Sequence, residues 1–317
     1  MLTYKKINQI LLNLPNNLPI YLAGHIRADQ DSVGSCLTLA IFLNANGKNA
    51  KVLLNPKDME VISWFEDLSL ICHKIVEADY NFIALDVNEA ERLGEFEDYF
   101  KTAHVTINVD HHQNNLYEAN YTLSKPGISS TCEMIFNIIN QSGKEYLTQE
   151  ICSLLYSGIM ADTNCFTRRL SNKTFYVAQK LINSGFSYVD VVKKAFSKRT
   201  MYEFKALAKL VNEIKFDGFH YVVVDQRLEE FKHLSHNNLV KSIAEDLRKI
   251  EDIDIFLMII IRDGYITTKT MSNNSECADK IAMQFGGGGH KKEAGFTVNN
   301  LTVEQIISKT KRFLKIK

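Results

Sequence analysis

Short apolar runs rich in β-forming residues alternate with helical patterns in the first half of the chain. Residues 33–43 have helical spacing that stops at Asn46-Gly47, and polar residues follow the ends of the apolar runs. Such alternation is typical of a parallel α/β sheet. The predicted strands are Pro19–Ala23, Ala50–Leu54, Asn81–Leu85 and Val105–Val109.

Helical patterns dominate the next part of the chain. From Val189 to about Lys215, charged and apolar residues continue at helical spacing without glycine or proline. We therefore expect a first domain over residues 1–190 and one connecting helix over residues 191–216. The helices predicted within the first domain after its strands are Thr131–Ile139, Gln149–Met160 and Thr174–Ile182.

The remaining residues, 217–317, have the pattern of a smaller mixed α/β domain. Its predicted strands are Tyr221–Val224, Ile255–Ile261 and Tyr265–Thr270. Its predicted helices are Leu239–Ile250, Cys277–Phe285 and Val303–Leu314.

Composition narrows the class of protein. A chain of 317 residues favours two domains, and equal numbers of basic and acidic residues (37 each) give no global field that would attract long nucleic acid. The longest apolar run, Phe256–Ile261, is too short to span a bilayer. Six scattered cysteines without a Cys-x-x-Cys pair are typical of reduced thiols. We expect a soluble cytoplasmic protein.

Candidate metal ligands follow three of the predicted strands. His25, Asp29 and Asp31 come directly after the first strand; taken alone, this segment is as often a helix cap as a ligand set. Asp86 ends a later strand, and the triplet 110–112, Asp-His-His, ends the next. Loops at the carboxyl ends of parallel strands meet at one edge of the sheet. Asp162 joins them if its helix points at the same edge.

Four carboxylates and two histidines would then converge. Mixed oxygen and imidazole ligands without a nearby cysteine indicate a pair of divalent ions such as Mn²⁺, with Mg²⁺ possible and Zn²⁺ less favoured. Two such ions can clamp a phosphoryl oxygen and supply a hydroxide nucleophile. The pattern therefore predicts phosphoester hydrolysis.

A glycine run in the second domain is a candidate anion-binding segment. Gly286, Gly287, Gly288 and Gly289 precede His290, and consecutive glycines let backbone N–H groups approach an anion closely. The alternative is a flexible turn. A position in the domain opposite the metal ligands favours substrate binding.

With these motifs, the sequence resembles the DHH phosphoesterases along essentially its whole length. Within that family it is similar to the short two-domain branch of oligoribonucleases, adenosine 3′,5′-bisphosphate phosphatases and dinucleotide phosphodiesterases. The motifs that carry the resemblance are His25-x-x-x-Asp29-x-Asp31-x-x-Gly34-Ser35, Asp86 with Glu91-Arg92, Asp110-His111-His112, Ser129-Ser130-Thr131 with Glu133, Asp162-Thr163, and Gly286–His290 with Ala294-Gly295.

The resemblance implies a role for each matching residue. One Mn²⁺ would be held by His25, Asp29 and Asp86, and a second by Asp31, Asp86, His111 and Asp162. His112 would contact the substrate phosphate and protonate the leaving oxygen, and Asp110 would orient a histidine. The active site would lie in the cleft between the two domains. The implied substrate contacts are Arg92, Ser130, Thr131, Lys269, Ser272, Gly286, Gly287, Gly288, Gly289 and His290.

Three departures from the family pattern stand out. Ala28 replaces a usual proline, and Glu293 replaces a usual small residue. Met271-Ser272 stands where Arg-Ser is common, and we hypothesise that Lys269 supplies the missing charge to a phosphate.

The resulting functional prediction is a Mn²⁺-dependent phosphodiesterase of very short oligonucleotides. It would hydrolyse linear diadenylate and nanoRNA to mononucleotides, act as a phosphatase on adenosine 3′,5′-bisphosphate, and could hydrolyse cyclic di-AMP. Alternatives are a pyrophosphatase, or a catalytically silent nucleotide-binding regulator, which would be expected to have lost a ligand. We expect no long nucleic acid and no membrane as partner; a homodimer is plausible by resemblance.

Overall fold

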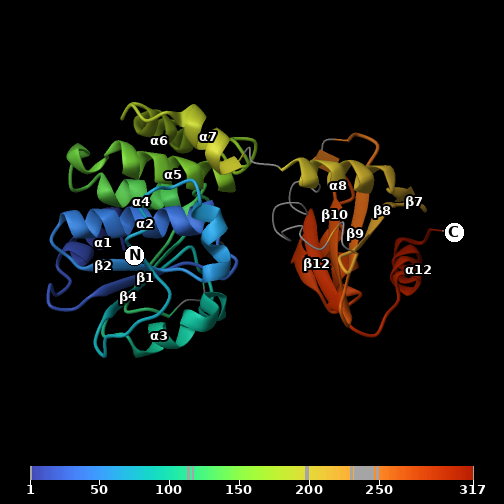
Figure 1. The fold of residues 1–317 in the computed structure, drawn as a ribbon, viewed down its shortest axis with the longest axis horizontal. Helices are drawn as coiled ribbons and strands as arrows, with labels where there is room; N and C mark the ends of the chain where they lie inside the picture. Colours follow the sequence, from blue (N-terminus) through green and yellow to red (C-terminus); the bar gives the residue numbers. More distant parts are fainter. Residues whose placement is uncertain are drawn as a thin grey trace. The chain divides into compact units, whose positions relative to one another are not determined.

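The structure is a computed structural model that describes residues 2–112, 115, 118–196, 200–228, 231, 246–247 and 250–316. It divides into two compact units, Met1–Lys198 and Arg199–Lys317. Each unit contains a six-stranded sheet with helices packed on it (Figure 1). The chain is therefore a mixed α/β protein, as the sequence predicts.

The first unit is built on an entirely parallel sheet. Its strand order is β3-β2-β1-β4-β5-β6, so the chain crosses over once between β3 and β4. The predicted parallel sheet is confirmed. The strands are β1 (Ile20–Ala23), β2 (Ala50–Leu53), β3 (Ile71–Cys72), β4 (Asn81–Leu85), β5 (Thr106–Asp110) and β6 (Tyr121–Ser124).

Helices cover both faces of this sheet because the inner strands are apolar on both sides. On β4, Ile83 and Leu85 pack into one core cluster, whereas Phe82 and Ala84 pack into another. Helices α1 (Tyr4–Leu12), α2 (Gln30–Ala45), α4 (Thr131–Ile139) and α5 (Gln149–Asp162) stack on the first face, and α3 (Glu97–Thr102) covers the second. Helices α6 (Asn172–Ile182) and α7 (Tyr188–Phe196) pack on α5, and the short 3₁₀ helices are η1 (Pro56–Ile62), η2 (Ala90–Phe96) and η3 (Lys144–Tyr146).

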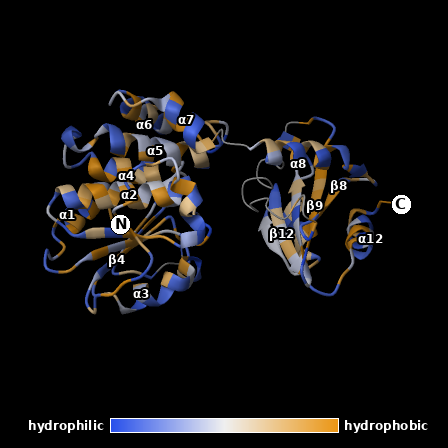
Figure 2. Cartoon of the chain, viewed as in Figure 1, coloured by the Kyte–Doolittle hydropathy of each residue, from blue (hydrophilic) through white to orange (hydrophobic). Residues whose placement is uncertain are grey.

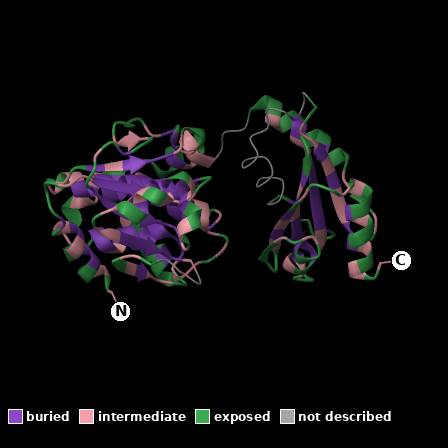
Figure 3. Cartoon of the chain, turned by 90° about the horizontal axis from the view of Figure 1, so that it is seen from below, coloured by how far each residue is buried: buried purple, intermediate pink, exposed green. Residues whose placement is uncertain are grey.

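The second unit has a mixed sheet in the order β11-β12-β10-β9-β8-β7. Among the described strands, β8 and β9 alone pair in parallel. Strand β9 is apolar along nearly its whole length (Figure 2) and mostly buried, and Figure 3 shows buried positions along the strands of this sheet. The strands are β7 (Lys215–Phe216), β8 (His220–Asp225), β9 (Ile255–Arg262), β10 (Tyr265–Ser272), β11 (Gly288–His290) and β12 (Glu293–Val298).

Among the described residues of this unit, helices cover both faces of the sheet. Helix α8 (Met201–Asn212) packs on one face, and α11 (Ala278–Met283) and α12 (Val303–Leu314) pack on the other. Most of the predicted helix Leu239–Ile250 lies outside the described residues. Among the residues that are described, no helix has both the length and the apolar character needed to cross a lipid bilayer.

The prediction of one connecting helix over residues 191–216 is wrong. Helix α7 ends at Phe196, and a separate helix, α8, begins at Met201. Thr200 has an extended backbone, its side chain accepts from the Glu203 N–H, and the Glu203 side chain accepts from the Thr200 N–H. This reciprocal cap starts a new helix. Its signal, Thr-x-x-Glu, is present in the sequence and outweighs the continuous helical spacing.

Candidate metal centre and substrate contacts

The loop after β1 places the first candidate ligands. Asp29 caps the N-terminus of α2 by accepting hydrogen bonds from the N–H groups of Asp31 and Ser32. The Nδ1–H of His25 donates to the Ile26 carbonyl (2.9 Å), which leaves Nε2 as the ring's free acceptor. This Nε2 lies 3.4 Å from Asp86 Oδ2 and 3.9 Å from Asp29 Oδ1. The segment is thus both a helix cap and a ligand cluster.

Asp31 is a fully buried carboxylate at the start of α2. Its two oxygens accept hydrogen bonds from the backbone N–H groups of Thr131 (2.7 Å) and Cys132 (2.8 Å) at the N-terminus of α4. A helix N-terminus stabilises negative charge. Burial and the neighbouring carboxylates Asp86 and Asp162 nevertheless raise the pKa of Asp31 well above its usual value. A cation beside this residue would offset that repulsion.

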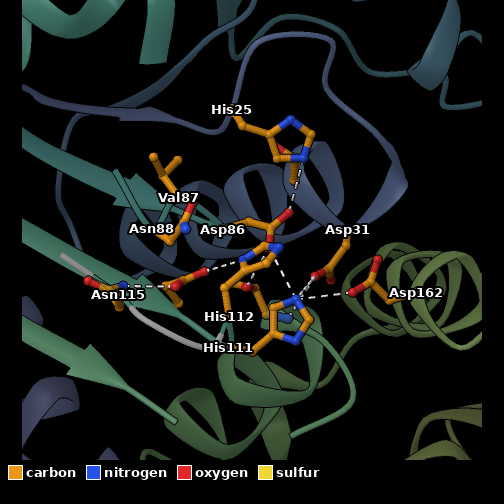
Figure 4. A network of polar contacts seen from close by, with 12 residues as sticks. His25, Asp31, Asp86, Val87, Asn88, His111, His112, Asn115 and Asp162 are labelled. Atoms are coloured by element: carbon orange, nitrogen blue, oxygen red, sulfur yellow. Dashed lines mark hydrogen bonds and ion pairs between the residues drawn. The ribbon is translucent and has the colours of Figure 1, made fainter. Parts of the chain in front are cut away.

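Asp86 occupies the centre of the cluster (Figure 4). It follows β4 with a left-handed backbone (φ 62°), a conformation that costs energy in a non-glycine residue and is common at functional sites. The Thr131 hydroxyl donates to its Oδ1 (3.1 Å). Burial opposes ionisation of Asp86, but the contacts with His111 and His25 outweigh burial and lower its pKa. Asp86 is therefore held as a carboxylate between two imidazoles.

His111 faces three carboxylates. Its Nδ1–H donates to the Ile128 carbonyl (3.2 Å), and its buried Nε2 forms no hydrogen bond of good geometry. That Nε2 lies 3.0 Å from Asp162 Oδ2, 3.5 Å from Asp86 Oδ1 and 4.0 Å from Asp31 Oδ2. Burial lowers the pKa of His111, but Asp162 and Asp86 raise it overall to about 12. Only a proton or a metal ion can satisfy an imidazole nitrogen in these surroundings.

His112 is oriented by buried Asp110, which in turn contacts half-buried Asn115. Its Nδ1–H donates to Asp110 Oδ1 (2.7 Å), and the other oxygen of Asp110 accepts from the Asn115 amide (2.8 Å). The His112 side chain is 34% exposed, so its ring can reach solvent or a ligand while one nitrogen stays fixed. Nothing in the sequence pattern indicates Asn115, because its contact with Asp110 depends on how the loop after β5 folds.

The donor set fits divalent metal ions. Three groups of described residues each bring ligand atoms within 4.8 Å of one another: His25, Asp29 and Asp86; Asp31, His111 and Asp162; and Asp86, His111 and His112. His25 and His111 each donate Nδ1–H to a backbone carbonyl, the arrangement that fixes metal-binding imidazoles. Buried carboxylates packed this closely require a compensating cation. The cluster can hold metal at the carboxyl edge of the parallel sheet.

The other predicted contacts of the first unit surround these ligands. Thr131 holds two of the carboxylates directly, through its hydroxyl and its backbone N–H. Ser130 caps α4 by accepting from the Glu133 N–H. Arg92 is exposed on η2, and its carbonyl accepts from the Ile26 N–H. Ala28, which departs from the family pattern, donates its N–H to Asp58 (3.2 Å), a bond that proline lacks the N–H to make.

The predicted contacts of the second unit lie on β10, β11 and the turn before β11. Gly287 approaches β12 so closely that a Cβ there would lie 2.2 Å from the Gly295 carbonyl oxygen. The side chain of His290 is exposed at the sheet edge. Ser272 is buried and accepts from the Cys277 N–H (3.3 Å). Lys269 donates to the Glu293 carboxylate (3.1 Å), so the two departures from the family pattern contact each other.

Comparison with known proteins relates the first unit to a family. Residues 19–159 match the model described as the DHH family, N-terminal domain, and this segment contains every candidate ligand except Asp162. The six-stranded parallel sheet and all of the candidate cluster except Asp162 lie in this segment, which is similar to the DHH domain and is called by that name.

Two curated relatives and one solved structure are similar over most of the chain. A Thermus thermophilus protein, "Bifunctional oligoribonuclease and PAP phosphatase NrnA", is 27% identical over 90% of this chain and 86% of its own length. An Aster yellows witches'-broom phytoplasma protein, "Membrane protein-large ribosomal subunit bL9 fusion protein", is 25% identical over 96% of this chain, which spans only 37% of that relative. An exopolyphosphatase-related protein from Bacteroides fragilis shares the fold, with a TM-score of 0.84, 20% identity and coverage of 98% and 95% of the two chains.

Proposed function

We propose that this protein is a metal-dependent phosphoric-ester hydrolase that cleaves very short oligonucleotides, with linear dinucleotides such as pApA as the main substrates. The observation that carries the proposal is Asp86, a buried carboxylate between His25 and His111 at the carboxyl edge of the DHH sheet. The name of the Thermus thermophilus relative supports the substrate class and a second activity on adenosine 3′,5′-bisphosphate. Cyclic di-AMP is a further candidate substrate.

Two groups of residues would hold the metal ions. His25, Asp29 and Asp86 form one group, and Asp31, Asp86, His111 and Asp162 form the other, so that Asp86 belongs to both. When bound, a pair of Mn²⁺ or Mg²⁺ ions neutralises phosphoryl oxygens and lowers the pKa of water. The predominance of oxygen donors supports Mn²⁺ or Mg²⁺ over Zn²⁺.

His112 is the proposed general acid. Asp110 accepts the Nδ1–H, which fixes the orientation of the ring. The proton on Nε2 would then pass to the leaving sugar oxygen as the phosphorus–oxygen bond breaks. The Nδ1–H stays with the ring throughout, so His112 becomes a neutral imidazole and regains its proton from solvent. Asp110 is a positioning residue in this scheme.

The second unit would bind the terminal phosphate of the substrate. The exposed His290 and the glycines before it supply N–H donors, and Lys269 supplies a positive charge. The six cysteines form no disulfide bonds, which supports action in a reducing compartment such as the cytoplasm.

Hydrolysis assays test the proposal. The purified chain would be incubated with Mn²⁺, with Mg²⁺ and with chelator, and offered linear diadenylate, cyclic diadenylate, a short RNA, adenosine 3′,5′-bisphosphate and pyrophosphate. We expect linear diadenylate to be cleaved to AMP fastest, and the activity to disappear with chelator and return with Mn²⁺. Preferential cleavage of pyrophosphate would establish the pyrophosphatase instead. Bound metal and nucleotide without turnover of any substrate would establish the regulator.

A further inference from the structure

One face of the second sheet brings three charged or polar side chains together at its β11 edge. Lys269 on β10 lies opposite Gly295 on β12, which lies opposite Gly288 on β11. Two positions along, Glu293 on β12 lies opposite His290 on β11. Directly opposed residues of antiparallel strands share a face, as do residues two apart on one strand. Lys269, Glu293 and His290 therefore project from the same face.

The two glycines leave the space beside Lys269 open. A Cβ built on Gly288 meets no atom within 4 Å, and one on Gly295 meets only the Thr268 carbonyl oxygen, at 3.1 Å. The Lys269 side chain reaches diagonally past Gly295 to Glu293, where its Nζ lies 3.1 Å from Oε1. Because Gly288 and Gly295 have no side chains, a compact anion can approach the Lys269 ammonium group closely.

The ion pair itself is weak enough to be exchanged. The side chains of Lys269 and Glu293 are 32% and 37% exposed, and ion pairs that contact solvent contribute little net stability. A phosphate monoester carries more charge than a carboxylate and has three acceptor oxygens. It is the stronger partner for a lysine with a neighbouring histidine donor.

We propose that the Lys269–Glu293 pair is an exchangeable lock on a site for a terminal phosphate monoester, in which Glu293 competes with the phosphate for Lys269. The phosphate displaces the Glu293 carboxylate from Lys269 and accepts a second hydrogen bond from His290. An uncharged terminal hydroxyl does not displace Glu293, so the binding of unphosphorylated ends does not depend on the pair. Glu293 therefore weakens the binding of phosphorylated ends alone. The inference rests on the proposed function for the identity of the ligand as a nucleotide.

Isothermal titration calorimetry on the full Mn²⁺-loaded chain tests the lock. The probes are AMP, which has a terminal phosphate and no phosphodiester to cleave, and adenosine, which lacks the phosphate. We expect Glu293→Gln to bind AMP about fivefold more tightly, or about 1 kcal/mol, with adenosine binding unchanged. Lys269→Gln should bind AMP more weakly than the wild type. The double variant Lys269→Gln/Glu293→Gln should have the same AMP affinity as Lys269→Gln alone.

The matched control is Asp217→Asn. Asp217 pairs with Lys311 in the same unit (2.7 Å, side chains 45% and 26% exposed), so the substitution makes the same charge change in a similar ion pair. It should leave AMP binding unchanged. The lock is refuted if Glu293→Gln leaves AMP affinity at the wild-type value, if it tightens AMP and adenosine equally, if Asp217→Asn has the same effect, or if no variant binds AMP.

Different results would contradict the lock and the proposed function. A chain that shows the expected binding pattern but hydrolyses no dinucleotide retains the lock and loses the hydrolase. A chain that hydrolyses pApA with Mn²⁺ but binds AMP independently of Glu293 retains the hydrolase and loses the lock.

Discussion

The candidate metal centre of the DHH domain and the Lys269–Glu293 pair of the second unit both contain carboxylates, but in opposite surroundings. Asp31 and Asp86 are buried and held by backbone N–H groups, a hydroxyl and two imidazoles. Lys269 and Glu293 are partly exposed on a sheet edge. Electrostatic interactions are strong away from water and weak beside it. The first region is therefore built to hold its ligands fixed, and the second can exchange them.

The largest effect should come from Asp86→Asn. The metal ions contribute several kcal/mol to hydrolysis, so disrupting the residue shared by both ligand groups should lower kcat for pApA by about a thousandfold. Steady-state assays with Mn²⁺ measure this loss, and circular dichroism checks the fold. The matched control, Asp98→Asn, changes an exposed carboxylate on α3 and should retain full activity. An active Asp86→Asn variant would contradict the assignment of the metal centre.

Asp110→Asn should have an intermediate effect. The amide cannot hold the protonated His112 ring as the carboxylate does, and loss of such an orienting partner typically costs about 10- to 100-fold. We expect kcat to fall with KM little changed, which steady-state assays on pApA would measure. An unchanged kcat would show that Asp110 does not position the acid.

The metal-free protein should lose stability as pH rises from about 6.5 to 9. Burial lowers the pKa of His25, but Asp86 and Asp29 raise it overall to about 9, against the usual value of 6.5. A raised histidine pKa contributes stability that is complete below the unfolded pKa and is lost as pH rises through the folded pKa. Calorimetric melting in chelator would measure the slope, and His25→Gln should reduce it.

The same protonation opposes metal binding. Because His25 must be neutral to bind a metal ion, Mn²⁺ binding should release protons at pH 7.5 and tighten as pH rises. Titrations in buffers of different ionisation enthalpy count those protons. Proton release that is unchanged in His25→Gln would contradict the assignment of His25 as a ligand.

The smallest effect should come from breaking the exposed pair. Glu293→Gln should change the free energy of unfolding by less than about 1 kcal/mol, as is usual for surface ion pairs. Chemical denaturation measures this value, with Asp217→Asn as the control. A loss of several kcal/mol would show that the pair is structural and would weaken its interpretation as an exchangeable contact.

Local patterns were enough to predict four strands of the DHH domain sheet, β1, β2, β4 and β5, and the loops that carry its candidate ligands, but not the strands β3 and β6. Strand β4 has the predicted bounds, because a short apolar run ending in a polar residue is a local signal. The support that α4 gives to Asp31 is not local, since it joins residues about 100 positions apart. The Lys269–Glu293 contact likewise depends on the register of β10 and β12. Sequence patterns therefore indicated the candidate metal ligands, but not the distant backbone and side-chain groups that hydrogen-bond to them.

Manganese anomalous diffraction from crystals of the full chain tests the central claim most directly. We expect two peaks about 3.5–4 Å apart at the carboxyl edge of the DHH sheet, with Asp86 between them, His25 and Asp29 beside one, and Asp31, His111 and Asp162 beside the other. No peak at this cluster under saturating Mn²⁺, or a single peak that Asp86 does not contact, would contradict the account.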